Sequence, residues 1–335
     1  MNATIRAIAY HFPERQVTNG DLAADHPDWQ VAKIQSKTGI ESRWISGPEE
    51  CSSDLAVKAA EKLFAEGACR RKEVDFVLLC TQSPDYFLPT TACLIQDRLD
   101  LPTHCGALDY NLGCSGYIYG LGLAKGLIET GQARTVLLLT AETYSKFVRD
   151  GDRNVQTIFG DAAAATLLRA DDDTQAGPSL GPFVYGTDGK GGPNLMVGTG
   201  GMRQRTPLGA VNVSGERFED HLFMNGPEIF TFTLAIVPPM LSELLEKAGR
   251  TMDEIDLFVF HQANKFMLEH LRKKLSVPES KFVYCLAQCG NTVSSTIPIA
   301  LRDAADRGLL KSGNLVMAVG FGVGYSWGAT LIRWA

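Results

Sequence analysis

The chain has 335 residues, 45% of them hydrophobic, and a formal net charge of −6. A chain of this length can bury one large core or the cores of two fused halves. It has no basic block or stripe that could neutralise a run of phosphates, which argues against a nucleic-acid-binding protein. No apolar run is long enough for a signal peptide or a membrane span, so we expect a cytoplasmic protein without membrane contact.

The eight cysteines show no paired CxxC spacing. In a chain of this length, cysteines without that spacing suit neither a disulfide framework nor a zinc site. We therefore expect most of them to be reduced, buried and structural, and we expect no bound metal.

In chain order, short apolar runs alternate with amphipathic helical stretches, which is typical of an α/β protein. The clearest expected strands are "EVDFVLLCT" (73–81), "ARTVLLLTA" (133–141), "EIDLFVFHQ" (254–262) and "GNLVMAVGF" (313–321). The third matches the first at an offset of 254 − 73 = 181, and the fourth matches the second at 313 − 133 = 180. Two matches in the same order predict an internal duplication, with halves 1–172 and 173–335.

The stretch "NLGCSGYIYG" (111–120) sets Cys114 where an apolar helix of small residues is expected to begin. A helix start offers unpaired N–H groups and a partial positive charge, which favour a thiolate and lower the thiol pKa. Cys114 is therefore a candidate nucleophile, although a buried structural cysteine explains the residue equally simply when it is taken alone.

Two polar residues of the second half are candidates to join Cys114. His261 lies at the carboxyl end of the expected strand 254–262, and Asn291 follows a glycine at another expected helix start. Taken singly, His261 could be a core histidine and Asn291 a helix cap. Because the carboxyl ends of parallel strands gather ligands in open α/β sheets, we expect thiol, imidazole and amide to converge.

Four motifs resemble, in this order, the active-site motifs of β-ketoacyl-acyl carrier protein synthase III, a condensing enzyme of the thiolase fold. They are "NLGCSGYIYGL", "HQANKFM", "CGNTVSSTIPIAL" and "FGVGYSWGATLIRW". The resemblance covers nearly the whole chain. It implies a five-layered αβαβα fold of two similar halves, a homodimer, and a catalytic triad of Cys114, His261 and Asn291.

The resemblance also implies a reaction in two steps. Cys114 takes an acyl group from acyl-CoA, and a malonyl thioester on acyl carrier protein then loses carbon dioxide and attacks the acyl-cysteine. His261 and Asn291 would donate hydrogen bonds to the enolate, and the backbone N–H groups of Cys114 and Val323 would stabilise the tetrahedral oxyanion. CoA is thus a substrate, and no further cofactor is expected.

For CoA, the resemblance assigns Lys37 and Arg153 to the phosphates, and Gly226 and Asn264 to the tunnel that holds pantetheine. The family often has a tryptophan that stacks on adenine at the position of Lys33. Trp29 lies one turn earlier in this chain, so the adenine contact departs from the family pattern.

The surface expected to receive the carrier protein departs from the pattern as well. An arginine that the family often uses for docking is Phe266 here. Lys265, Arg272, Lys273 and Lys274 still offer either a basic face for an acidic carrier protein or an ordinary solvated helix face.

The loop "PDYFLPTTAC" (84–93) bears on chain length. In the family, this loop carries a side chain, often phenylalanine, across the dimer interface into the acyl channel of the partner. Here that residue is Leu88, which is smaller, so we expect a deeper acyl pocket and primers longer than acetyl. Tyr86 or Phe87 would refill the channel if the loop shifted by one residue, and Leu88 could equally be ordinary interface packing.

These departures make a housekeeping fatty-acid initiator less certain than an enzyme that primes a specialised polyketide or lipid pathway. One alternative is a thiolase-fold acyltransferase that moves an acyl group from CoA to a non-malonyl acceptor. Another is a non-catalytic partner subunit of a condensing-enzyme pair. A cysteine protease also uses Cys, His and Asn in this order, but the duplicated halves argue against it.

Overall fold

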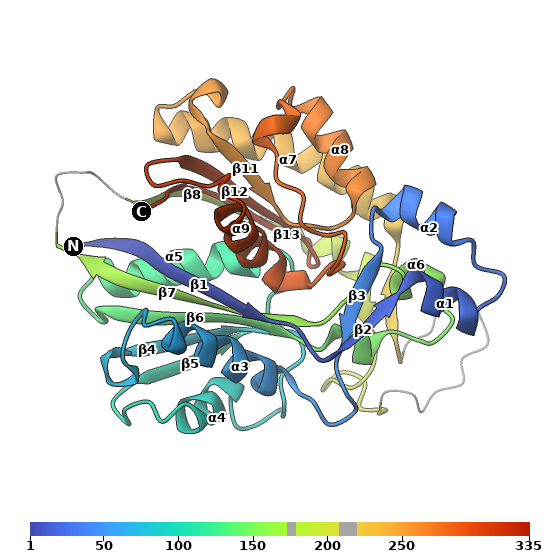
Figure 1. Cartoon of the computed structure of the whole chain (residues 1–335), viewed down its shortest axis with the longest axis horizontal. Coiled ribbons are helices and arrows are strands. Elements are labelled where there is room, and N and C mark those ends of the chain that lie inside the picture. Colours follow the sequence, from blue (N-terminus) through green and yellow to red (C-terminus); the bar gives the residue numbers. More distant parts are fainter. Residues whose placement is uncertain (173–178, 208–219) are drawn as a thin grey trace.

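The computed structural model describes residues 1–172, 179–207 and 220–335, and it contains two main β-sheets (Figure 1). The first sheet has the order β1-β7-β6-β4-β5, with β1 (Asn2–His11), β4 (Phe76–Cys80), β5 (Gly106–Tyr110), β6 (Thr135–Glu142) and β7 (Ala162–Asp171). The second has the order β11-β12-β13-β8, with β8 (Leu180–Thr187), β11 (Leu257–Phe260), β12 (Leu315–Gly322) and β13 (Ser326–Arg333). β4 is parallel to β6, and β11 is parallel to β12.

The strand register confirms the duplication. Phe76 pairs with Val136 in the first sheet, and Leu257 pairs with Val316 in the second. These pairs are related by 257 − 76 = 181 and 316 − 136 = 180, the offsets found in the sequence. The expected boundary adjoins residues 173–178, which lie outside the described residues, so the halves 1–172 and 173–335 stay a prediction.

Helices cover both sheets and fill the space between them, which gives five layers (Figure 1). α5 (Gly116–Glu129) and α9 (Thr296–Asp306) lie between the sheets and contact strands of both. α3 (Ser52–Ala65) and α4 (Thr91–Arg98) cover the outer face of the first sheet, and α7 (Gly226–Ala248) and α8 (Lys265–Lys274) cover that of the second. The predicted αβαβα architecture is confirmed.

Close packing of the middle layers explains the composition of their elements. All eight residues of β6 and all eight of β12 are buried, as expected for strands covered by helices on both faces. In α5, a Cβ atom at Gly120 would lie 2.6 Å from Leu138 Cδ1 and would also collide with the Tyr110 hydroxyl. Glycine in this helix therefore lets α5 approach the first sheet closely.

Short elements complete the described part of the chain beside these layers. They are β2 (Arg15–Thr18), α1 (Asn19–Asp25), α2 (Val31–Thr38), β3 (Ser42–Ile45), α6 (Arg153–Gln156), β9 (Leu195–Val197), β10 (Leu222–Met224) and six short 3₁₀ turns, of which η6 (Val293–Ser295) matters for the site. β2 pairs with β3, and β9 pairs with β10. Figure 1 shows that β2, β3, α1 and α2 gather at one end of the molecule.

Among the helices of the described residues, α7 alone has the length and apolar composition that crossing a membrane would require. Its buried positions are 229, 233, 237, 240, 241 and 244. This spacing marks one helix face, which packs against β8, β12 and β13 of the second sheet. Packing in the outer layer thus accounts for the apolar side of α7.

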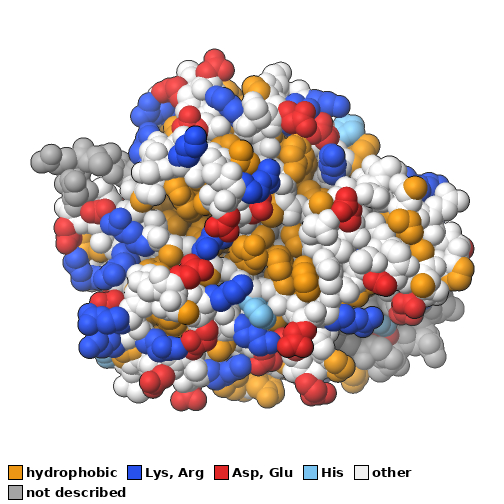
Figure 2. All heavy atoms as spheres, in the orientation of Figure 1, with side chains coloured by type: hydrophobic (Ala, Val, Ile, Leu, Met, Phe, Trp, Pro, Cys, Tyr) orange, Lys and Arg blue, Asp and Glu red, His pale blue; other side chains and the backbone are white. Residues whose placement is uncertain are grey.

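All eight cysteines are free, and four of them are buried: Cys69, Cys80, Cys114 and Cys289. Cys93 is exposed, so the expectation that most cysteines are buried is correct for only half of them. Within residues 1–172, 179–207 and 220–335, no group of three or more His, Cys, Asp or Glu side chains could hold a metal ion. On the face shown in Figure 2, basic and acidic side chains are interspersed, and hydrophobic side chains gather near the centre.

Candidate active site

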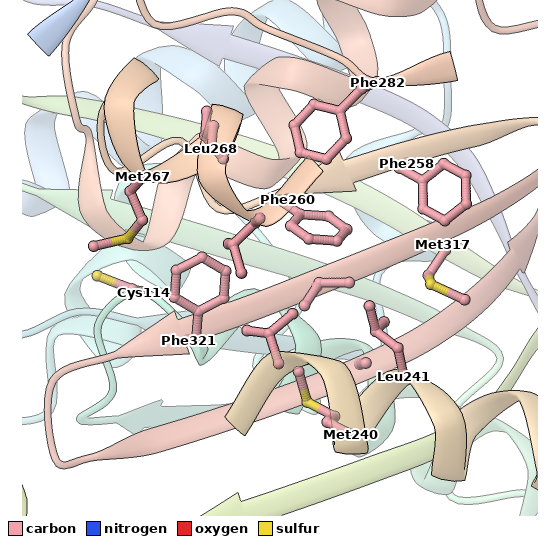
Figure 3. Close-up of a cluster of buried hydrophobic side chains, with 14 of the residues drawn as sticks. Cys114, Met240, Leu241, Phe258, Phe260, Met267, Leu268, Phe282, Met317 and Phe321 are labelled. Carbon is pink, nitrogen blue, oxygen red and sulfur yellow. The ribbon is translucent and has the colours of Figure 1, made fainter. Parts of the chain in front are cut away.

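Cys114 lies in the turn directly before α5 and is 5% exposed. The turn packs closely against the end of β12, a strand of the second half of the chain. A Cβ atom at Gly322 would lie 2.8 Å from Cys114 Cβ and 2.9 Å from its Sγ, and one at Gly320 would lie 2.9 Å from the Cys114 carbonyl oxygen. Figure 3 shows the Cys114 side chain at the end of a hydrophobic cluster, beside Met267 and Phe321.

The environment of the Cys114 thiol differs from the one expected. Burial raises its pKa to about 12, and the negative charge of Glu142 acts in the same direction. The backbone N–H groups of Val323 and of Cys114 itself oppose this shift without overcoming it. The prediction that the helix start would lower the thiol pKa is therefore wrong for the ligand-free protein, because desolvation outweighs the N–H groups. The predicted nucleophile is therefore a neutral thiol around pH 7, and a base would have to remove its proton.

His261 directly follows β11, and its backbone N–H donates to Val319 O at 2.8 Å, which keeps it in register with β12. The side chain is 2% exposed. Its Nδ1 lies 2.7 Å from Thr296 Oγ1, and its ring packs edge-on against Phe321 with centroids 5.7 Å apart. Burial lowers the pKa of His261 to about 3, although the Val293 carbonyl partly opposes the shift. The imidazole is therefore neutral around pH 7.

Asn291 lies in the loop before η6, and the backbone fixes it firmly. Its N–H donates to Ile158 O at 2.9 Å, and its carbonyl accepts from Gly160 N–H at 3.0 Å. Its side-chain Oδ1 accepts from Val293 N–H at 2.9 Å. Because the oxygen of the amide is occupied, the Nδ2 group is the part of Asn291 that can donate to a ligand.

The three predicted catalytic residues therefore lie around one structural junction. Cys114 contacts Gly322 of β12, and His261 packs on Phe321 of the same strand. Val293, which donates to the Asn291 side chain, belongs to the same cluster of buried side chains as Cys114. The first half contributes the thiol, and the second half contributes the imidazole and the amide.

A cavity of about 720 Å³ brings together the four residues predicted to bind CoA, namely Lys37, Arg153, Gly226 and Asn264. Asn264 caps α8 by accepting from Met267 N–H at 2.9 Å, so its side-chain amide nitrogen remains available as a donor. With Lys33, the cavity thus collects three cations and a polar amide, a composition that suits a phosphorylated ligand. Their role in CoA binding stays a prediction.

Lys33 and Trp29, the two residues that bear on the adenine contact, lie in different places. Lys33 lines the same cavity, whereas Trp29 is absent from its lining within the described residues. Trp29 is 7% exposed and stacks on His26, with ring centroids 4.4 Å apart. It belongs to a small core beneath α1 and α2 with Val17, Leu22 and Ile34. In this conformation Trp29 cannot offer its ring to an adenine.

On α8, the helix expected to carry a basic face, Glu269 partly neutralises the positive charge. Arg272 forms an ion pair with Glu269 at 3.0 Å, and Lys273 lies 3.8 Å from the same carboxylate. Phe266 is 52% exposed and lines the 720 Å³ cavity. The surface near the cavity mouth therefore combines an exposed ring with a partly paired basic cluster.

Leu88 lies on an exposed loop after β4. The loop presents Tyr86, Phe87 and Leu88, which are 63%, 76% and 84% exposed in the single chain. Leu88 is therefore largely open to solvent in the single chain, and its expected role in an acyl channel depends on a partner subunit.

Glu142 is a buried carboxyl beside the site that sequence reasoning missed. It accepts from Gln82 N–H at 3.0 Å and from the Ser294 hydroxyl at 2.9 Å, and so it ties β4 to the loop that carries Asn291. Burial raises its pKa to about 8. The internal repeat could have pointed to Glu142. With the offset of 180, position 142 corresponds to position 322, and Gly322 lies beside Cys114.

Comparisons with known proteins agree with this geometry. The family model of 3-oxoacyl-[acyl-carrier-protein] synthase III matches residues 108–189, and the model of the C-terminal part of that family matches residues 245–334. A curated β-ketoacyl-[acyl-carrier-protein] synthase III of Caldanaerobacter subterraneus is 34% identical over 99% of this chain and 98% of its own. One of Clostridium perfringens is 38% identical over 99% of each chain.

Solved structures show the same relationship. A 3-oxoacyl-(acyl-carrier-protein) synthase III is 52% identical, with a TM-score of 0.96 over 100% of both chains. The priming β-ketosynthase of the R1128 polyketide biosynthetic pathway is 26% identical, with a TM-score of 0.87 over 99% of this chain and 96% of its own. The fold and the site define a condensing enzyme of the thiolase fold, an acyltransferase. The chain belongs to the β-ketoacyl-[acyl-carrier-protein] synthase III family.

Proposed function

We propose that this protein transfers an acyl group from acyl-CoA to Cys114 and condenses it with a malonyl thioester, with release of carbon dioxide. The observation that carries the proposal is the junction at the end of β12, where Cys114, the neutral ring of His261 and the amide of Asn291 gather. A buried thiol beside a neutral base and a free amide donor suits acyl transfer followed by enolate chemistry.

In the first step, the Cys114 thiol gives its proton to the imidazole of His261. A base is needed because the thiolate is the nucleophile, whereas the raised pKa keeps the resting group a thiol. The sulfur attacks the thioester carbonyl, and the bond from carbon to the CoA sulfur then breaks. The departing CoA thiolate takes the proton from the imidazolium. The N–H groups of Cys114 and Val323, which interact with the resting sulfur, support the tetrahedral oxyanion.

In the second step, the malonyl thioester loses carbon dioxide, and the electron pair of the broken C–C bond forms an enolate. Its oxygen accepts hydrogen bonds from Asn291 Nδ2 and His261 Nε2. The enolate carbon then attacks the acyl carbonyl on Cys114, and the thiolate of Cys114 leaves and takes up a proton from solvent. Because the Asn291 oxygen is held by Val293, the amide is already oriented for this task.

The substrates follow from the 720 Å³ cavity and from the names of the relatives. Lys33, Lys37 and Arg153 line the cavity and complement the phosphates of CoA. The relatives are named for an acyl carrier protein, and we propose that the malonyl group arrives on such a protein. No cofactor besides the CoA thioester is needed for either step.

We further propose that the protein is a homodimer in the cytoplasm. The loop with Tyr86, Phe87 and Leu88 exposes three large apolar side chains in the single chain. β5 lies at the edge of the first sheet, and Leu108 of this strand is 45% exposed. An exposed apolar loop beside an open sheet edge supports a second copy as the covering partner.

The departures at Lys33 and Phe266 favour priming of a specialised pathway over a housekeeping role, and the priming β-ketosynthase among the structural relatives agrees with this. Two other functions use the same site differently. An acyltransferase with a non-malonyl acceptor would load Cys114 but release no carbon dioxide. A non-catalytic partner subunit would do neither.

The test is intact-mass measurement after incubation with acetyl-, butyryl- or octanoyl-CoA, followed by malonyl-acyl carrier protein with detection of carbon dioxide. We expect one acyl group on the wild-type protein, lost again when the malonyl substrate is added. Cys114→Ala should take up none, while Cys93→Ala, which removes an exposed thiol, should behave as wild type. Asn291→Ala should still be acylated but should release little carbon dioxide. Acylation of Cys114→Ala would contradict the proposal.

A further inference from the structure

Thr296, the first residue of α9, lies against the ring of His261. Its Oγ1 is 2.7 Å from His261 Nδ1 and 3.0 Å from Val293 O, and the side chain is 2% exposed. A hydroxyl has a single proton and can also accept. The Thr296 hydroxyl therefore cannot donate to Val293 O and to His261 Nδ1 at the same time.

Two hydrogen-bond arrangements are compatible with these distances. In the first, Thr296 donates to Val293 O and accepts from Nδ1–H of His261, so Nε2 of the neutral ring carries a lone pair. In the second, Thr296 donates to an unprotonated Nδ1, so Nε2 carries the proton. Because the ring is neutral around pH 7, one nitrogen is protonated in each arrangement and the other is not.

The two steps of the proposed reaction need different arrangements. Acceptance of the Cys114 proton requires the lone pair on Nε2, which is the first arrangement. Donation to the enolate oxygen requires Nε2–H, which is the second. A neutral ring can present Nε2–H only where Nδ1 can accept, and the hydroxyl of Thr296 is the donor that faces Nδ1.

We propose that Thr296 is a positioning residue whose hydroxyl makes both tautomers of His261 available, the Nδ1–H form for acylation and the Nε2–H form for decarboxylation. This inference rests on the proposed function of the site. The two forms contain the same number of protons. They interconvert when one ring nitrogen takes up a proton, the other loses one, and the hydroxyl rotates.

The chain offers a substitution that separates the two forms. Thr296→Val keeps the shape of the side chain and removes the hydroxyl. The Val293 carbonyl, which already interacts with the ring, then remains as a partner for Nδ1–H, and nothing donates to an unprotonated Nδ1. The variant should therefore hold His261 in the Nδ1–H form.

The experiment compares acylation, measured by intact mass, with carbon dioxide release from malonyl-acyl carrier protein. For Thr296→Val we expect acylation within a few-fold of wild type and decarboxylation slower by about a hundredfold, the usual cost of losing one oxyanion donor. Thr296→Ser should restore both steps. Thr292→Val is the matched control, because Thr292 lies in the same loop, is buried, and has no hydrogen-bond partner for its hydroxyl within the described residues.

A second measurement reads the tautomer directly. In ¹⁵N NMR of protein labelled at histidine, with the His261 signals assigned by comparison with His261→Ala, wild type should populate the Nε2–H form and Thr296→Val should not. Unchanged decarboxylation, an equal loss of both steps, or the same tautomer in both proteins would overturn the inference. Failure of wild type to take up an acyl group would refute the proposed function instead, and the NMR comparison would still decide the role of Thr296.

Discussion

Gly322 sets how closely the nucleophile turn can approach β12, and Gly322→Ala tests this contact. The added Cβ would lie 2.8 Å from Cys114 Cβ and 2.9 Å from Sγ. Carbon atoms in ordinary contact are about 3.5 Å apart, so the turn must move by about 0.7 Å. Overpacking of this kind costs roughly 1–3 kcal/mol of unfolding free energy.

The same displacement should slow acylation more than it destabilises the fold. A shift of about 1 Å in a reacting group can cost about a hundredfold in rate, so we expect acylation of Gly322→Ala to slow by roughly tenfold to a hundredfold. The assay is quenched-flow acylation by butyryl-CoA with intact-mass detection, together with urea unfolding. Gly126→Ala in α5 is the control, because a Cβ there meets nothing within 4 Å. Wild-type acylation by Gly322→Ala would refute the reasoning.

Three further substitutions probe the pocket, the cavity and the buried carboxyl. Leu88→Phe should shift the preference among acetyl-, butyryl- and octanoyl-CoA toward acetyl, since each buried methylene is worth about 0.8 kcal/mol; an unchanged profile would remove Leu88 from the acyl pocket. Arg153→Ala should raise the KM for acyl-CoA about tenfold, the loss of one charge-assisted hydrogen bond, and leave decarboxylation unaffected. Burial raises the pKa of Glu142 from 4.5 to about 8, so its folded form binds the proton more tightly and its contribution to stability is lost as pH rises between these values. The Tm of Glu142→Gln should therefore fall less than that of wild type between about pH 5 and pH 8, and parallel Tm curves would contradict this.

The sequence predicts the architecture well because the duplication repeats the apolar strand sequences at a nearly constant offset. The offsets of 181 and 180 between apolar runs reappear in the strand register, since buried parallel strands require similar residues in similar order. The placement of Cys114, His261 and Asn291 follows from the same repeat. In these respects, periodicity and motif order are sufficient.

Other features depend on three-dimensional contacts that the sequence does not display. The thiol pKa was predicted in the wrong direction because Cys114 is buried among side chains of the second half and packs against Gly322, about two hundred residues away. The sequence places Trp29 one turn before Lys33, but it does not display that Trp29 packs on His26 inside a separate small core. The link from Thr296 to His261 was missed because a threonine at a helix start is usually read as a cap.

The backbone of Asn291 is hydrogen-bonded to Ile158 and Gly160, so the position of this residue depends on contact between the two halves. Each half can form its own sheet, but neither holds the amide, the imidazole and the thiol in register by itself. The ability to be acylated should consequently return only after the halves dock, later than helical and strand signals do. The time at which acyl uptake returns during refolding thus reports when the two halves dock, and it needs no spectroscopic probe.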